Sequence, residues 1–143
     1  AMTVQPYVSF EGRAEEAAKF YENAIDAKIE ALMRFKDAPP MDGPPPEGCQ
    51  PGPAMTPEKI MHMSLKVGDT TVMGTDGMCS GRPAFQGISL ALSCRSEAEA
   101  AKKFAALGEG GAVQMPLAKT FFSPAFGMVA DKFGVNWMVV TTP

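Results

Sequence analysis

Ala14-Glu15-Glu16-Ala17-Ala18-Lys19-Phe20-Tyr21 is the stretch that decides the fold, because it occurs again in altered form as Ala98-Glu99-Ala100-Ala101-Lys102-Lys103-Phe104. Each copy has the apolar spacing of a helix and follows a strand-like run, at 7–10 and at 88–92. Further strand-like runs follow each copy. An internal repeat of this size indicates that one supersecondary unit occurs twice. The sequence therefore predicts two similar halves that pair around a shared concave surface, where a functional site would lie.

Both halves predict the same order of elements: a strand, a helix and three strands. In the first half we expect a strand at 7–10, a helix at 14–25 and strands at 28–35, 59–67 and 70–75. In the second half we expect a strand at 88–94, a helix at 97–107 and strands at 112–118, 127–130 and 135–141. The predicted fold class is α+β, with two tandem βαβββ modules that form open half-barrels around a concave cleft. We expect a single domain over 1–143, with modules at about 4–76 and 87–143.

The segment 36–58 separates two predicted strands of the first half. It contains eight of the thirteen prolines, which predicts a long loop. A loop of this length in a small domain is either functional or disordered, and the sequence leaves both readings open.

The composition is that of a globular protein, with 45% hydrophobic and 20% charged residues. A net charge of −3 gives no electrostatic reason to expect nucleic acid or an anionic membrane as a partner. No apolar run approaches the roughly 20 residues of a membrane span, and we expect no signal peptide. The three cysteines have no paired spacing, so we expect no disulfide framework and a cytoplasmic location.

Eleven methionines are many for a chain of this length. Methionine is flexible and polarizable and fills irregular apolar space. The methionines therefore indicate either ordinary core packing or a soft, adaptable pocket.

Several short motifs occur in an order and spacing that are more specific than any one of them. They are 6–10, 20–21, 59–62 and Gly68 in the first half, and 114–116, 120–122, 126–127 and 131–138 in the second. Through these motifs, residues 4–141 resemble the PhnB-like group of the vicinal oxygen chelate superfamily, also called the glyoxalase/bleomycin-resistance/dioxygenase fold. The resemblance implies two βαβββ half-barrels and, in general, a homodimer.

Members of this group often carry labels taken from ubiquinone-pathway methyltransferases. A methyltransferase is expected to have a nucleotide-type fold in which a Gly-rich turn follows a strand and opens a helix. The Gly-rich stretch at 108–111 follows a predicted helix instead, and is better read as the end of that helix. The sequence gives the methyltransferase label no support.

Metal-dependent relatives hold a divalent ion with His, Glu or Gln from four strands, two in each module. The corresponding positions of this chain are Gln5 (or Pro6, one residue along), Met73, Ser89 and Met138. One amide, one hydroxyl and two thioethers do not make a site for zinc, nickel, iron or manganese. We therefore expect the usual metal to be absent and no cofactor to be bound.

His62 is the only histidine, and it lies outside that metal pattern. Its neighbours Met61 and Met63 fall on the apolar side of a predicted strand, so His62 and Ser64 should point into the concave face. A neutral imidazole there can act as a general base or bind a ligand. The alternative is a structural histidine bonded to a neighbouring strand or to a dimer partner.

Other residues are expected to line the same cavity. Tyr7 and Ser9 share a strand face with Gln5, and Tyr7 could stack on a flat ligand while donating a hydrogen bond. The phenylalanines at 121, 122 and 126 could wall a pocket, or belong to the core or an interface. Asp76 beside Gly77 indicates a turn. The residues expected to contact a ligand are Gln5, Tyr7, Ser9, Ser64, Met73, Ser89, Phe122 and Met138, with His62 as the candidate catalytic residue.

Three functions remain open from the sequence. The first is a metal-free small-molecule binding protein, as in bleomycin-resistance members, with an unknown ligand. The second is a metal-independent isomerase, lyase or hydrolase that uses His62 with Tyr7 or Ser64. The third is an interaction or regulatory protein whose own side chains fill the cavity. Binding is favoured, because no pair of groups divides the work of acid and base.

Overall fold

The computed structural model describes residues 2–37, 56–77 and 83–142, so most of the predicted 36–58 loop and two of the three cysteines, Cys49 and Cys79, lie outside the described residues. The chain divides into two compact units, which we call unit 1 (1–83) and unit 2 (84–143). The prediction that the two modules make one domain stays a prediction. Unit 1 contains β1 (Tyr7–Ser9), α1 (Ala14–Ile25), β2 (Lys28–Arg34), the short 3-10 helix η1 (Phe35–Asp37), β3 (Ile60–Val67) and β4 (Thr70–Thr75). Unit 2 contains β5 (Leu90–Cys94), α2 (Glu97–Gly108), β6 (Ala112–Ala118), β7 (Phe126–Ala130) and β8 (Asn136–Thr141).

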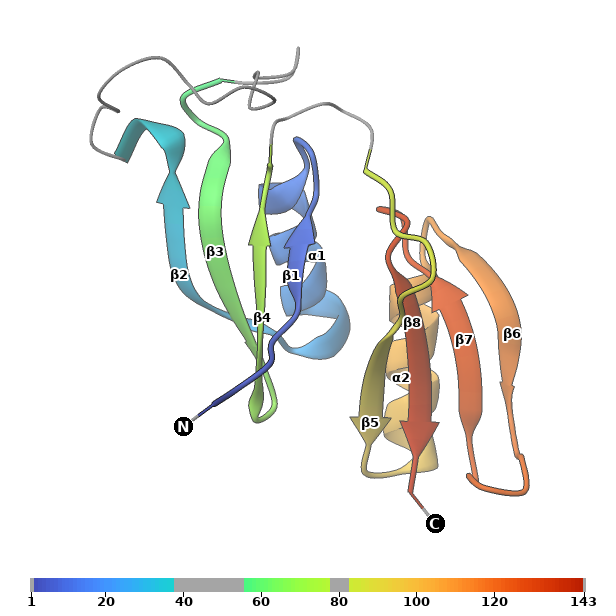
Figure 1. The fold of residues 1–143 in the computed structure, drawn as a ribbon. Helices are drawn as coiled ribbons and strands as arrows, with labels where there is room; N and C mark the ends of the chain where they lie inside the picture. Colours follow the sequence, from blue (N-terminus) through green and yellow to red (C-terminus); the bar gives the residue numbers. More distant parts are fainter. Residues whose placement is uncertain (1, 38–55, 78–82, 143) are drawn as a thin grey trace. The chain divides into compact units, whose positions relative to one another are not determined.

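The two units have the same sheet topology. The strand order is β1-β4-β3-β2 in unit 1 and β5-β8-β7-β6 in unit 2, with the first and last strand of each module parallel and the other neighbours antiparallel. In each unit the helix lies against one face of its own sheet (Figure 1). This architecture confirms the predicted α+β fold with two βαβββ modules.

In unit 1 the core lies between α1 and the sheet. The buried residues of α1 recur at helical spacing, and most are alanines that let the helix approach the strands closely: Ala14, Ala17, Ala18, Tyr21, Ala24 and Ile25. They face strand residues such as Met63 and Leu65, which are fully buried. On β3 these two alternate with the partly exposed His62 and Ser64. The sequence alternation therefore decides which side chains point away from the helix.

In unit 2 the last strand alternates in the same way. Trp137 and Val139 are buried, whereas Asn136, Met138 and Val140 are only partly buried, as their alternation predicts. On β7, Gly127 lies so close to α2 and β6 that a Cβ atom there would meet the Phe104 ring at 2.7 Å. The second helix therefore packs closely on its sheet.

Four predicted strand starts are wrong by one or two residues. β3 begins at Ile60 rather than at residue 59, and β7 begins at Phe126 rather than at residue 127. β5 begins at Leu90 rather than at residue 88, and Ile88 is 70% exposed. The Asn136 side chain donates to the backbone oxygens of Phe85 and Ile88, which holds this segment outside the ladder. β8 begins at Asn136 rather than at Val135, because the Val135 N–H donates to the Asp131 carboxylate. The helix α2 likewise extends to Gly108 instead of ending before it.

The Gly-rich stretch 108–111 closes α2. Gly110 has a φ of +77°, and the Gly111 N–H donates to the Gly108 carbonyl at 3.0 Å. In the part of the chain that the structure describes, this stretch does not open a helix. Among all the residues that the structure describes, no helix is long and apolar enough to cross a membrane.

Each unit is tied together by one buried aspartate. Asp76, 1% exposed, accepts hydrogen bonds from the backbone N–H groups of Gly12, Ala14 and Ile60. It thereby fixes the start of α1 and the start of β3 to the end of β4, and it takes the place of a capping side chain at Arg13. The sequence indicated only a turn at this position.

The second aspartate closes the turn before β8. Asp131, 3% exposed, accepts from the N–H groups of Phe133 and Val135 and from the indole nitrogen of Trp137. Both carboxylates satisfy donors that would otherwise be buried without partners.

Candidate functional site

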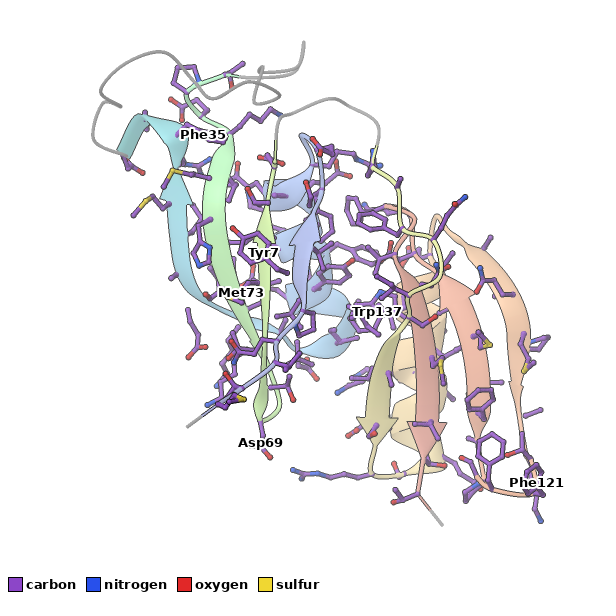
Figure 2. All side chains as sticks on the ribbon, viewed as in Figure 1. Tyr7, Phe35, Asp69, Met73, Phe121 and Trp137 are labelled. Atoms are coloured by element: carbon purple, nitrogen blue, oxygen red, sulfur yellow. The ribbon has the colours of Figure 1, made fainter. Side chains whose placement is uncertain are left out.

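The face of the unit 1 sheet that points away from α1 carries most of the predicted first-half residues. We call it the helix-free face of unit 1, and it includes Tyr7, Met33, His62, Ser64 and Met73. The strand register places Tyr7 beside Met73, and Met73 beside Ser64. Tyr7 and Met73 project from the neighbouring strands β1 and β4 (Figure 2). Residues from four strands thus share one surface.

His62 lies between two hydroxyl groups on this face. Its Nδ1 atom is 3.3 Å from the Tyr7 hydroxyl, and its Nε2 atom is 3.4 Å from the Ser64 hydroxyl. The Tyr7 and His62 ring centroids are 5.7 Å apart, with the planes tilted by 37°. Both hydrogen bonds are long, so they orient the imidazole more than they stabilise the fold. Tyr7 itself is 54% exposed, which leaves its ring available to a ligand.

Apolar side chains flank this polar group. Met33 on β2 pairs with His62 on β3 and is 42% exposed. Met73 on β4 pairs with Ser64 on β3. Sequence reasoning missed Met33, because register shifts on either side of it interrupt the regular alternation of β2. The face therefore combines two hydroxyls, one imidazole and two adaptable thioethers.

The chemistry of the face follows from what surrounds the imidazole. Within the described residues, the ring nitrogens of His62 hydrogen-bond hydroxyls and no carboxylate. A neutral imidazole placed in this way can accept a proton. It can also accept a hydrogen bond from one hydroxyl while it donates a hydrogen bond to the other.

The remaining predicted residues do not all join this group. Ser9 lies on β1, where its hydroxyl donates to Glu11 at 3.1 Å. Gln5 is exposed in the segment before β1, and Ser89 is exposed just before β5. Met138 and Phe122 belong to unit 2, and Phe122 makes edge contacts with Phe121 and Phe126 at 5.1 Å between centroids. Phe121, at the tip of the β6–β7 hairpin, is fully exposed (Figure 2).

The positions of the superfamily metal ligands do not fit a divalent ion. The β1 residue beside Met73 is Tyr7 rather than Gln5, and the β5 residue beside Met138 is Ala91 rather than Ser89. A phenol, a methyl group and two thioethers are no better as ligands for zinc, iron or manganese than the set expected from the sequence. In the ranges 2–37, 56–77 and 83–142, no three His, Cys, Asp or Glu residues come close enough to hold an ion.

The corresponding face of unit 2 is apolar. Its row of paired residues is Ala91, Met138, Met128 and Met115, where unit 1 has Tyr7, Met73, Ser64 and Ala31. We call this surface, together with Phe126, the helix-free face of unit 2. On the same side of β8, Asn136 accepts a 3.0 Å hydrogen bond from the Gln114 amide.

Unit 1 also has a charged cavity of about 420 Å³ beside the start of α1. Its walls carry both signs of charge. Arg13 and Glu16 of the wall form an ion pair with each other, and the wall residue Glu15 is paired with Arg34 at 2.6 Å. The Arg34 guanidinium lowers the pKa of the Glu15 carboxyl below its usual value, with a smaller opposing effect from burial. Lys59 donates to the Gly12 carbonyl at 2.8 Å. These pairs indicate a structural role for this cavity.

Comparison with known proteins agrees with the fold. The family described as 3-demethylubiquinone-9 3-methyltransferase matches residues 2–140. Protein YjdN of Escherichia coli strain K12 is 30% identical over 138 residues, which cover 96% of this chain and 94% of that protein.

Solved structures extend this similarity. Protein PA1353 from Pseudomonas aeruginosa is 36% identical with a TM-score of 0.81, over 99% of this chain and 98% of the other. A PhnB protein from Bacillus cereus is 26% identical with a TM-score of 0.77, over 99% and 100%. A glyoxalase/bleomycin resistance protein from Albidiferax ferrireducens T118 shares the fold at 16% identity and a TM-score of 0.62, over the whole of both chains. The chain therefore belongs to the family described as 3-demethylubiquinone-9 3-methyltransferase and, within the vicinal oxygen chelate superfamily, to its PhnB-like group.

Proposed function

We propose that this protein binds a small organic molecule on the helix-free face of unit 1, without a divalent metal ion. The observation that carries the proposal is the placement of His62 between the Tyr7 and Ser64 hydroxyls on a face lined by thioethers. A largely apolar surface with a few converging polar groups is the usual character of a ligand site. In this proposal Tyr7, Ser64, Met73 and Met33 contact the ligand, and His62 orients the two hydroxyls.

The other residues predicted to contact a ligand lie away from His62 and its two hydroxyl partners. Ser9 is the last residue of β1 and Gln5 precedes the strand, so both would contact only a ligand that extends along β1. Ser89, Phe122 and Met138 belong to unit 2 and have no part in this proposal for unit 1. We further propose that the protein is a homodimer, which light scattering at micromolar concentration tests; a monomeric mass would contradict it.

Native mass spectrometry of protein purified from its own host, combined with elemental analysis, tests the binding function. We expect a retained organic molecule and no stoichiometric divalent metal. A stoichiometric metal would contradict the proposal and would make an enzyme the leading candidate.

A metal-independent enzyme is the second candidate, and the contact of His62 with two hydroxyls is the observation that favours it. If His62 is an acid or base, His62→Ala abolishes turnover of the ligand while its binding survives. If the protein only binds, the same variant changes affinity alone. A purely structural histidine would instead lower the melting temperature and leave affinity unchanged.

We do not extend the methyl transfer named in the family description to this chain. The Gly-rich stretch that a nucleotide-type methyltransferase would place at the start of a helix instead ends α2. The fold alone does not assign an activity, because function resides in the site.

A further inference from the structure

The two hydroxyl groups beside His62 are coupled through its ring. A neutral imidazole has one N–H donor and one bare nitrogen that accepts. When Nδ1 is bare, Tyr7 donates to it, Nε2–H donates to Ser64, and the Ser64 hydroxyl proton is left over. When Nε2 is bare, Ser64 donates to it, Nδ1–H donates to Tyr7, and the Tyr7 proton is left over. Each tautomer therefore leaves one hydroxyl proton without an acceptor within the group of three.

That remaining proton has a consequence for ligand choice. Any molecule that covers this face removes water from the free hydroxyl, and a covered donor without an acceptor is unfavourable. Thioether side chains lie next to the hydroxyls, with Met73 beside Tyr7 and Met33 beside His62. A suitable ligand therefore presents one acceptor atom within an otherwise apolar, flat body that can lie on the Tyr7 ring.

We infer that the helix-free face of unit 1 selects flat, apolar molecules that carry a carbonyl oxygen, and that Tyr7 donates its hydroxyl proton to that oxygen. This inference rests on the proposed function, because it assumes a ligand on this face. Tyr7 rather than Ser64 is the donor, since its side chain is the more exposed of the two. Donation by Tyr7 requires the Nδ1–H tautomer of His62, so ligand binding shifts the ring toward that tautomer.

Two neutral probes of nearly equal shape isolate the contribution of the carbonyl oxygen to the binding affinity. They are acetophenone and α-methylstyrene, in which a CH₂ group replaces the carbonyl oxygen. Neutral probes are needed because Lys28 and Lys66 form a directly opposed pair on the same sheet and would attract an anion. The chain has one histidine, so nitrogen-15 labelling of the imidazole gives signals from His62 alone.

Titration of the His62 ring signals then gives both affinities and the tautomer. We expect acetophenone to bind about fivefold more tightly than α-methylstyrene, as one added hydrogen bond allows. We also expect acetophenone to raise the Nδ1–H population. In the double variant Tyr7→Phe, Ser64→Ala the affinity ratio falls to one or below, because the carbonyl oxygen is then covered without a donor. The control Ser93→Ala, on β5 of unit 2, keeps the wild-type ratio.

The possible failures are distinguishable. Equal affinity of the two probes for the wild type, or binding with no change of tautomer, would overturn the carbonyl inference and leave the binding site in place. If neither probe moves the His62 signals up to its solubility limit, both the inference and the proposed site are wrong. Backbone amide spectra of the variants show that each one is folded.

Discussion

The helix-free faces of the two units occupy corresponding positions in the same topology, and their chemistry is different. Where unit 1 has Tyr7 and Ser64 on either side of Met73, unit 2 has Ala91 and Met128 on either side of Met138. Two residues before Ser64 on β3, unit 1 has His62. Two residues before Met128 on β7, unit 2 has Phe126. The backbone pairing is therefore independent of the polar groups, and the polar groups mark where the two faces differ in chemistry.

The buried aspartates provide the largest expected effect, because both units depend on one. Asp76→Ala and Asp131→Ala should each lower the free energy of unfolding by about 3 kcal/mol or more, since each leaves several buried donors without acceptors. Urea unfolding measures the change, and Asp69→Ala in the exposed turn after β3 is the control.

The single tryptophan makes this comparison sharper. Trp137 fluorescence reports unit 2, whereas circular dichroism reports both units. If the units unfold together, Asp76→Ala shifts both signals equally. A shift in circular dichroism with unchanged fluorescence would show that the two units unfold separately.

Two buried glycines test how closely the interior of each unit is packed. In Gly127→Ala the new Cβ would meet the Phe104 ring at 2.7 Å and the Leu117 backbone at 3.0 Å, so we expect a loss of about 2 kcal/mol. In Gly74→Ala it would first meet the flexible end of Met63, which can move, so the loss should be smaller. Equal losses in urea unfolding would contradict this account of unit 2 packing.

Exchange of side chains between the two faces tests whether the polar group serves the fold. His62→Phe with Ser64→Met gives unit 1 the side chains that unit 2 has at these positions. Because the two hydrogen bonds are long and the site is partly exposed, we expect unfolding free energy to change by about 1 kcal/mol or less. A much larger loss would show that His62 is a structural residue.

The Glu15–Arg34 ion pair should give the smallest effect. The pKa of Glu15 is lowered in the folded protein, so the pair stabilises unit 1 above the unfolded pKa of Glu15 and ceases to do so as pH falls through its folded pKa. Glu15→Gln should therefore be slightly less stable than the wild type at pH 7 and no different at about pH 2. The control is Glu22→Gln, on the exposed side of α1. If Glu15→Gln still had a lower free energy of unfolding than the wild type at about pH 2, the loss could not come from the ion pair with Arg34.

Local patterns in the sequence were enough to predict the repeat, the helices and the orientation of His62. The alternation of Met63 and Leu65 with His62 and Ser64 is a short-range signal, and the structure retains it. Family resemblance was needed to predict that the two βαβββ modules belong to the vicinal oxygen chelate fold.

The features that could not be predicted depend on contacts distant in the chain. Asp76 next to Gly77 indicates a turn, but its carboxylate binds N–H groups 16, 62 and 64 residues away. The start of β5 was missed because Asn136, far along the chain, holds the preceding segment outside the ladder. The contact of Tyr7 with His62 spans 55 residues and depends on the order β1-β4-β3, which no local pattern encodes.

The most direct test of a metal-free site in unit 1 is native mass spectrometry, with elemental analysis, of three proteins expressed in the source host. These are the wild type, the His62→Phe, Ser64→Met variant, and Ser93→Ala as the unit 2 control. The account predicts an organic molecule on the wild type and on the control, its loss from the double variant, and no stoichiometric metal in any of them. A molecule retained by the double variant, or a divalent ion bound one to one, would contradict it.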